Sequence, residues 1–248
     1  MDDRKEKVSV RNLTKKFGDL LVLDDISFDV KENEFVCIVG PTGCGKTTFL
    51  NSLTKIYNIT AGEILVNNEP VNLKKNNITY ILQEYSAMPW LTVEKNVGFG
   101  LDIKGIKGSE KTQRVAKYMD IVGLTHYKDY YPGQLSASML QRVVIARAFA
   151  VEPELLLMDE PYGQLDIELR FKLEDELISL WKKTKTTIIF ITHNIEEAVY
   201  MSEKILVLTN KPTKIKQEII NDLPYPRNIA DPKFVSLRNK VTDLIKWW

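Results

Sequence analysis

The chain has 248 residues, of which 44% are hydrophobic and 27% are charged, and its formal net charge is +1. This composition is typical of a globular protein, and the near-neutral charge gives no bulk reason to expect nucleic acid or an anionic membrane as a partner. The apolar runs are much shorter than the roughly 20 residues that span a bilayer, and the charged N-terminus lacks the apolar core of a signal peptide. Two cysteines and two histidines indicate neither a disulfide framework nor a metal cluster, so we expect a cytoplasmic protein.

The N-terminal part of the chain is predicted to be rich in β-strands. Apolar or alternating runs cover residues 8–13, 21–30 and 35–39, and a polar turn at residues 31–33 separates the last two. The residues directly after the third run match the phosphate-binding pattern G-x-x-x-x-G-K-[ST], in the strand-then-helix context that the pattern requires. A glycine-rich turn without a ligand is the alternative interpretation.

The phosphate-binding pattern has a physical reason at each position. Its glycines let backbone N–H groups turn toward a polyphosphate, and the helix that follows directs its positive dipole end at the same phosphates. Lys46 would reach the β- and γ-phosphates, and the Thr47 hydroxyl would bind Mg²⁺. The sequence therefore predicts a site for a nucleoside triphosphate with Mg²⁺ in this loop, which consists of Gly40, Pro41, Thr42, Gly43, Cys44, Gly45, Lys46, Thr47 and Thr48.

From residue 47 onward, predicted helices alternate with predicted strands. The helices are expected at residues 47–56, 93–103, 110–122, 136–151, 167–182 and 231–248, and the strands at residues 62–66, 78–82, 155–158 and 187–192. This order predicts a doubly wound α/β fold of the P-loop NTPase type, with an N-terminal antiparallel β region and an inserted α-helical subdomain. We expect a single domain over residues 1–248, made of a core (1–92 and 152–210), a helical subdomain (93–151) and a C-terminal hairpin and helix (211–248).

Two of these helices carry apolar residues at helical spacing, which predicts one buried face for each. In the helix at 167–182 these residues are Leu169, Leu173, Leu177, Leu180 and Trp181. In the C-terminal helix they are Phe234, Leu237, Val241, Leu244 and Ile245. The chain ends in Trp247 and Trp248, for which packing or fraying is the simpler interpretation and contact with a partner the alternative.

A second chemical motif lies at residues 155–160, where four apolar residues precede two carboxylates. In open α/β sheets, ligands bind at the carboxyl ends of the strands. Asp159 would there hold Mg²⁺ through its water shell, and Glu160 would polarise a water for in-line attack on a γ-phosphate. Taken alone, the pattern could equally be a strand that runs into a solvated turn, but the upstream phosphate loop favours the catalytic interpretation.

Five further landmarks stand around these two motifs. Gln83 and His193 each follow a predicted strand, Phe17 lies near the end of the β-rich segment, Gly-Gln-Leu-Asp occupies residues 163–166, and Leu-Ser-Ala-Ser-Met-Leu-Gln-Arg opens a helix at residues 135–142. Each is a weak signal by itself, but their order and spacing are informative. With them, the chain resembles the nucleotide-binding subunit of an ATP-binding cassette (ABC) transporter over essentially its whole length.

The resemblance implies an ABC ATPase fold and a role for each landmark. Gln83 would contact Mg²⁺ in the Q-loop, and His193 would contact the γ-phosphate as the switch histidine. Asp166 would belong to the D-loop, which communicates across a dimer. Phe17 would stack on adenine, where the family more commonly has tyrosine. The implied partners are a second ATPase subunit, as a homodimer or a heterodimer, and membrane permease subunits.

The segment at residues 135–142 departs from the family signature Leu-Ser-Gly-Gly. The resemblance implies that this element binds the γ-phosphate of ATP held by the other subunit, and Ser136 keeps the hydroxyl for that contact. Ala137 and Ser138 replace the two glycines and add Cβ bulk, and each would cost about 1 kcal/mol if a positive φ were required. We expect a weakened contact between subunits, unless the partner is a different ATPase subunit with an intact signature.

Two segments suggest which transporter the chain serves. With no membrane-spanning stretch, the permease is expected on separate chains, as in importers. Residues 88–97 (Met-Pro-Trp-Leu-Thr-Val-Glu-Lys-Asn-Val) and 222–227 (Asp-Leu-Pro-Tyr-Pro-Arg) resemble the nitrate/sulfonate/taurine group, whose relatives also carry thiamine precursors. Trp90 and Leu91 would lie at a permease-docking surface within residues 83–97, or else anchor a buried loop.

The expected protein is thus an ATP-hydrolysing subunit at the cytoplasmic face of the membrane. An extracytoplasmic substrate-binding protein is expected as an indirect partner, and no nucleic acid partner is expected. A non-transport ABC ATPase, or a low-turnover regulatory or assembly factor, is the alternative, the latter suggested by Ala137 and Ser138.

Overall fold

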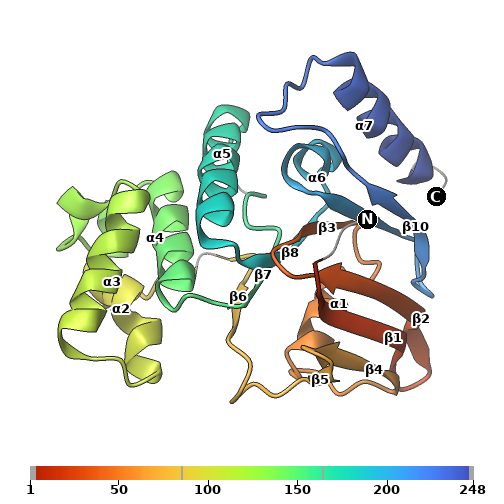
Figure 1. Ribbon diagram of the computed structural model, residues 1–248, viewed down its shortest axis with the longest axis horizontal. Helices are drawn as coiled ribbons and strands as arrows, with labels where there is room; N and C mark the ends of the chain where they lie inside the picture. The colour runs from red at the N-terminus through yellow and green to blue at the C-terminus, as the bar shows by residue number, and fades with distance from the viewer. Residues whose placement is uncertain (1–3, 85, 164, 246–248) are drawn as a thin grey trace. The chain divides into compact units, whose positions relative to one another are not determined.

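The computed structural model describes residues 4–84, 86–163 and 165–245. It divides into two compact units (Figure 1). The first unit contains residues 1–78 and 187–248, and the second contains residues 79–186.

The first unit begins with an antiparallel sheet, as the sequence predicts. Strands β1 (Glu6–Phe17) and β2 (Leu20–Lys31) form a long hairpin. The strand β4 (Ala61–Val66) pairs with the other edge of β1, and the two-residue strand β5 (Glu69–Pro70) follows it. Buried and exposed positions alternate along much of β2, because one face of such a sheet packs on the core while the other meets solvent.

A second set of strands in the first unit has the order β10-β9-β3-β8. The three strands β9, β3 and β8 are parallel, whereas β10 is antiparallel to β9. All residues of β3, β8 and β9 are buried, which explains their continuous apolar sequences. Their bounds are β3 (Phe35–Val39), β8 (Thr187–Thr192), β9 (Lys204–Leu208) and β10 (Ile215–Ile220).

Three helices complete the first unit. Helix α1 (Lys46–Leu53) begins with the last residues of the phosphate loop, and the short helix α6 (Ile195–Met201) connects β8 to β9. The C-terminal helix α7 (Pro232–Ile245) packs against α6 and β9 (Figure 1). On α7, Phe234 and Val241 are buried, and Leu237, Leu244 and Ile245 are half-buried, so the predicted apolar face is confirmed. Trp247 and Trp248 lie outside the described residues.

The second unit contains the helical insertion that the sequence predicts. Helices α2 (Val93–Ile103), α3 (Gly108–Ile121) and α4 (Ala137–Ala150) pack on one another (Figure 1). The unit also contains α5 (Ile167–Thr184), β7 (Leu155–Asp159) and most of β6 (Ile78–Ile81). The predicted buried face of α5 holds for four of its five residues, but Leu169 is 37% exposed because it lies in the first turn.

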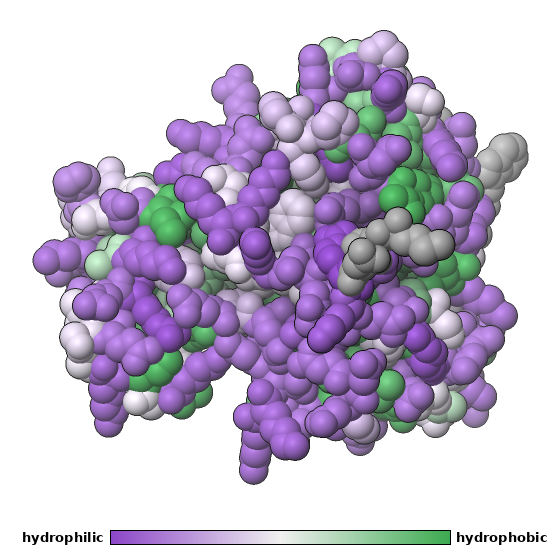
Figure 2. Space-filling view, in the orientation of Figure 1, coloured by the Kyte–Doolittle hydropathy of each residue, from purple (hydrophilic) through white to green (hydrophobic). Residues whose placement is uncertain are grey.

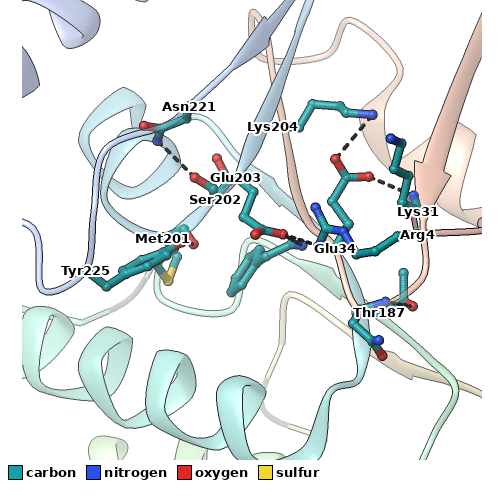
Figure 3. Close-up of polar contacts among 12 residues, drawn as sticks. Arg4, Lys31, Glu34, Thr187, Met201, Ser202, Glu203, Lys204, Asn221 and Tyr225 are labelled. Atoms are coloured by element: carbon teal, nitrogen blue, oxygen red, sulfur yellow. Dashed lines mark hydrogen bonds and ion pairs between the residues drawn. The ribbon is translucent and has the colours of Figure 1, made fainter. Parts of the chain in front are cut away.

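A buried polar cluster lies at the amino ends of β3 and β9 (Figure 3). The Lys204 ammonium is 3.3 Å from the Glu34 carboxylate and 3.2 Å from that of Glu218, and it donates to the Asp29 carbonyl at 2.9 Å. Lys204 and Glu34 are both buried, and burial raises the pKa of Glu34. This cluster holds the end of the parallel strands opposite to the phosphate loop.

The surface carries few large apolar patches in the view of Figure 2, where green side chains are scattered among hydrophilic ones. Within the described ranges, none of the helices combines the length and the apolar character needed to cross a membrane.

Candidate nucleotide-binding site

The phosphate loop leaves the carboxyl end of β3, and its backbone requires glycine. Gly43 and Gly45 have φ angles of +76° and +121°, which residues other than glycine rarely adopt. At Gly40 the reason is close packing instead, because a Cβ there would lie 3.0 Å from the Cβ of Leu208. The glycine spacing read from the sequence thus corresponds to two different physical constraints in the folded loop.

Lys46 is folded back onto the loop. Its ammonium donates hydrogen bonds to the carbonyls of Gly40 at 3.0 Å and Pro41 at 3.2 Å, and the residue is 5% exposed. Helix α1 begins at this residue, with Gly45 as its N-cap, so no side chain at the cap covers the first amides of the helix. Thr42 and Thr47 are exposed, and Thr48 is half-buried. The loop therefore offers amides, one ammonium and hydroxyls at one helix end.

Cys44 occupies the inner side of the loop. It is 1% exposed, and burial raises the pKa of its thiol. Its backbone carbonyl accepts a hydrogen bond from the hydroxyl of Thr213, which lies between β9 and β10. Thr213 is not predictable from the sequence, because no pattern links it to a loop that precedes it by 169 residues.

His193 lies at the same sheet edge as the phosphate loop. The parallel strands β3 and β8 pair in register, with Val39 opposite Thr192, so Gly40 and His193 leave neighbouring strands at the same level. His193 is exposed. Its turn is fixed on both sides, because Thr192 accepts from the Asn194 amide at 2.9 Å and the Asn194 side chain caps α6. This arrangement brings together two of the predicted site residues.

Phe17 ends strand β1 with an exposed ring, 42% accessible. The ring of Tyr57 packs against it at 5.2 Å between centroids and nearly at right angles, and the Lys15 ammonium lies 4.4 Å from the Phe17 centroid. These two neighbours fix the orientation of the ring. An exposed, oriented aromatic ring is the kind of surface on which a base stacks.

In the second unit, the carboxylates of Asp159 and Glu160 lie at the carboxyl end of a buried strand, as the sequence predicts. Asp159 is the buried last residue of β7, and it accepts a hydrogen bond from the Tyr80 hydroxyl at 3.2 Å. Glu160 follows with a φ of +45°, which turns the chain sharply at the strand end. The Gln83 amide donates to the Glu160 carboxylate at 3.4 Å, so these two predicted residues meet. Tyr80 is a neighbour that the sequence analysis did not identify.

The signature segment begins helix α4. Ser136 is the exposed N-cap, and its hydroxyl accepts from the Met139 amide at 3.3 Å and lies 3.1 Å from the Ser138 hydroxyl. Ala137 and Ser138 lie in the first turn of the helix and have no positive φ. The strain expected for a positive φ at these two residues therefore does not arise, and they differ from glycine in their added bulk and in the Ser138 hydroxyl.

Asp166 has a visible structural role as the N-cap of α5, where its carboxylate accepts from the Leu169 amide at 3.0 Å. It is exposed. Gln164, two residues earlier in the predicted D-loop, lies outside the described residues.

The segment after Gln83 is anchored to the helical part of the same unit. Asn96 is fully buried, and its side chain bonds the backbone of Met88 at 2.7 and 3.1 Å, as well as the carbonyls of Leu91 and Thr92 at 3.0 Å. The Arg147 guanidinium binds the carbonyl of Ser86 at 2.7 Å. Trp90 is nevertheless 72% exposed, so the buried-anchor alternative for this residue is wrong.

The residues proposed to bind Mg²⁺ are oxygen donors. Thr47 offers a hydroxyl, Asp159 a carboxylate and Gln83 an amide oxygen, and Mg²⁺ commonly binds one or two protein oxygens together with phosphate and water. Among the described residues, no group of three or more His, Cys, Asp or Glu side chains is arranged to hold a metal ion. The donor set thus fits a metal that arrives with a phosphate ligand.

The fold and the phosphate loop define a P-loop NTPase of the α/β class. Residues 23–163 match the family model described as ABC transporter. An uncharacterized ABC transporter ATP-binding protein of Methanocaldococcus jannaschii is 42% identical over 99% of this chain and 93% of its own length. The aliphatic sulfonates import ATP-binding protein SsuB of Bacillus cereus is 39% identical over 94% of each chain. The chain therefore belongs to the ABC transporter family, as an ATP-binding subunit.

Solved structures agree with this assignment. CbiO1 of Clostridium perfringens, part of the ABC transporter complex CbiONQ, has a TM-score of 0.79 at 25% identity, covering 88% of this chain and 89% of that one. A bacterial ABC transporter cassette described as dimeric has a TM-score of 0.76 at 29% identity, covering 88% of this chain and all of that one. The same cassette is also known in a post-hydrolysis state bound to ADP and Pi.

Proposed function

We propose that this subunit hydrolyses ATP to drive an ABC importer for a small solute of the nitrate, sulfonate, taurine or thiamine-precursor type. The observation that carries the proposal is the phosphate loop, with its glycines, its lysine and a helix N-terminus that no cap side chain covers. The loop leaves β3 beside β8, the strand that ends directly before His193. The sequence similarity to an aliphatic sulfonate import subunit supports the importer class.

The roles of the residues follow from their chemistry. The loop amides and Lys46 bind the β- and γ-phosphates, for which Lys46 exchanges its bonds to the Gly40 and Pro41 carbonyls. Phe17 stacks on the base. Glu160 orients a water and accepts its proton as that water attacks the γ-phosphate, while the bond from the γ-phosphorus to the bridging oxygen breaks and ADP leaves. His193 donates a hydrogen bond to the γ-phosphate.

Thr47, Gln83 and Asp159 would hold Mg²⁺, which would supply positive charge to stabilise the transferred phosphoryl group. Tyr80 holds the Asp159 carboxylate in one orientation through its 3.2 Å hydrogen bond. The Gln83–Glu160 bond is the polar link between a metal-binding residue and the catalytic carboxylate in the second unit.

The functional assembly contains two ATPase subunits, identical or different, in which Ser136 and Asp166 of each copy face the ATP bound to the other. The dimeric cassette among the structural relatives supports this arrangement. Closure of the dimer is driven by ATP because the closed state binds ATP better than the open state does.

Permease subunits dock on the second unit within residues 83–97, and the complex lies at the cytoplasmic face of the membrane. A substrate-binding protein outside the membrane delivers the solute. The exposed Trp90, presented on a backbone that Asn96 holds rigidly, supports this docking surface, because large exposed aromatic residues dominate many interfaces.

The first test is a comparison of ATPase rates between the wild type and Glu160→Gln in the reconstituted permease complex. We expect the substitution to lower kcat by roughly a hundredfold or more, because the amide cannot accept the proton of the attacking water. Glu168→Gln, at an exposed position on α5, is the matched control and should retain the wild-type rate. Equal background rates for the wild type and Glu160→Gln would refute the motor function and favour a low-turnover regulatory factor.

A further inference from the structure

Thr213 contacts the phosphate loop, although it lies 169 residues after Cys44 in the sequence. It lies in the segment between β9 and β10 and is fully buried. Its N–H donates to the Val22 carbonyl at 2.9 Å, and its carbonyl accepts from the Asp24 amide at 2.9 Å. These two bonds join Thr213 to β2 as an isolated parallel bridge, so the backbone from which its side chain extends is held in place.

From that position, the Thr213 hydroxyl donates to the backbone carbonyl of Cys44. The carbonyl of Cys44 and the N–H of Gly45 belong to the same planar trans peptide, in which the two groups point in opposite directions. A carbonyl held toward buried Thr213 therefore directs the Gly45 N–H away from the protein interior. That N–H is among the amides through which such a loop holds phosphate.

The packing around Gly45 supports the same constraint. A Cβ on Gly45 would lie 3.0 Å from Val22, 3.1 Å from Leu23 and 3.5 Å from the Thr213 hydroxyl oxygen. The glycine thus rests directly on β2 and Thr213, and its φ of +121° depends on how the preceding peptide is oriented. The hydroxyl is the polar contact that selects this orientation, because a carbonyl facing a methyl group there would be buried without a partner.

We propose that Thr213 is a positioning residue for nucleotide binding, which orients the Cys44–Gly45 peptide so that the Gly45 amide faces the phosphates. The inference rests on the proposed function of the loop. Thr213 does not touch the nucleotide itself; it acts through the loop. The ligand it serves is the polyphosphate part of the nucleotide, not the base.

The test compares Thr213→Val, which keeps the shape but removes the donor, with Thr213→Ser, which keeps the donor. Affinities for ATP and for inorganic tripolyphosphate are measured on the full chain, together with kcat and KM for ATP hydrolysis. We expect Thr213→Val to weaken both ligands about tenfold and to raise KM more than it lowers kcat, because one amide contact to a charged group is misaligned. Thr213→Ser should stay within about twofold of the wild type.

Two controls separate this role from a general loss of structure. Thr242→Val removes a similar hydroxyl-to-carbonyl bond, in α7, and should leave both affinities unchanged. Phe17→Ala should weaken ATP but not tripolyphosphate. If Thr213→Val does not fold, Thr213→Ala replaces it in the same comparison with Thr213→Ser.

Failure of the inference is distinct from failure of the proposed function. A wild type that binds neither ATP nor tripolyphosphate would refute nucleotide binding at this loop. A wild type that binds both, with equal affinities for the valine variant or with equal losses for the valine and serine variants, would overturn the role of the hydroxyl alone.

Discussion

Ala137 and Ser138 occupy the first turn of α4 without backbone strain, so they differ from glycine in side-chain bulk and in the hydroxyl of Ser138. The Ser138 hydroxyl lies 3.1 Å from that of Ser136. Under the proposed function, this contact engages the Ser136 hydroxyl that would reach the γ-phosphate in a partner subunit. The departure from the family signature thus acts on a hydroxyl and on the approach distance, and not on helix geometry.

Replacing both residues with glycine (Ala137→Gly, Ser138→Gly) should raise the ATPase rate of the assembled transporter severalfold, because it frees Ser136 and opens the approach to phosphate. The same double variant should lose roughly 1–2 kcal/mol of stability, since glycine is unfavourable in a helix. Steady-state ATPase assays and urea unfolding measure the two effects. An unchanged rate with the expected loss of stability would show that the substitutions in the signature are functionally neutral.

At the scale of single residues, the sequence predicts roles for Asp159, Glu160 and Gln83, and these roles stay predictions. The structure adds a contact that the sequence does not contain, because it brings Gln83 to Glu160. Tyr80 and Thr213 were missed because each acts through one hydroxyl at a place that depends on the folded chain. No spacing rule marks such residues.

Among the elements, α6 is held by the segment at residues 222–227, which the sequence analysis connects with a group of importers. Arg227 ends the segment at residues 222–227, and its guanidinium donates to the carbonyls of Val199 at 2.8 Å, Tyr200 at 3.1 Å and Ser202 at 2.7 Å. These carbonyls lie at the C-terminus of α6, where backbone acceptors lack helical partners. The Tyr225 ring lies 4.1 Å from the guanidinium carbon and its hydroxyl binds the Met201 carbonyl at 2.6 Å. The segment therefore holds the short helix that follows His193.

Arg227→Met should lower the free energy of unfolding by roughly 3 kcal/mol, because several buried carbonyls lose a charged donor at once. Urea unfolding followed by circular dichroism measures the change. Arg238→Met is the matched control, since Arg238 binds α6 through the partly exposed Glu196 at 3.2 Å and should cost less than about 1 kcal/mol. Equal losses for the two variants would contradict the capping role of Arg227.

The sequence predicts most elements to within a residue or two, including α2 and β8 at their observed bounds. It gives no bounds for the two-residue strand β5, nor for α6, β9 and β10, which are short and follow one another closely between residues 195 and 220. A helix of seven residues is not stable by its own propensity and exists here because both ends are capped by distant or neighbouring side chains. Such elements depend on tertiary contacts that a local pattern does not contain.

For the molecule as a whole, Trp90, which is 72% exposed, is the residue that we expect to matter most for binding the permease. Trp90→Ala should reduce permease binding at least tenfold, because it removes a large apolar side chain from the proposed docking surface. Basal ATPase activity of the isolated subunit should stay at the wild-type level. The measurements are co-purification with the permease from detergent-solubilised membranes and the ATPase rate in each state.

Ile103→Ala is the control for general loss of surface hydrophobicity, since Ile103 is also 72% exposed and lies outside residues 83–97. It should leave permease binding intact. Equal binding by the Trp90 variant and the wild type would exclude Trp90 from the docking surface, while leaving nucleotide hydrolysis untouched.

The bonds of Lys46 to the Gly40 and Pro41 carbonyls have a thermodynamic consequence. These bonds, together with the bond between Thr213 and the Cys44 carbonyl, hold the backbone of the loop in one conformation. Capture of a nucleotide then requires little ordering of the chain, so only a small part of the interaction free energy is lost to conformational entropy. Under the proposed function, the remainder is available to shift the subunit pair toward its closed state, so the order of the loop would affect how strongly ATP drives transport.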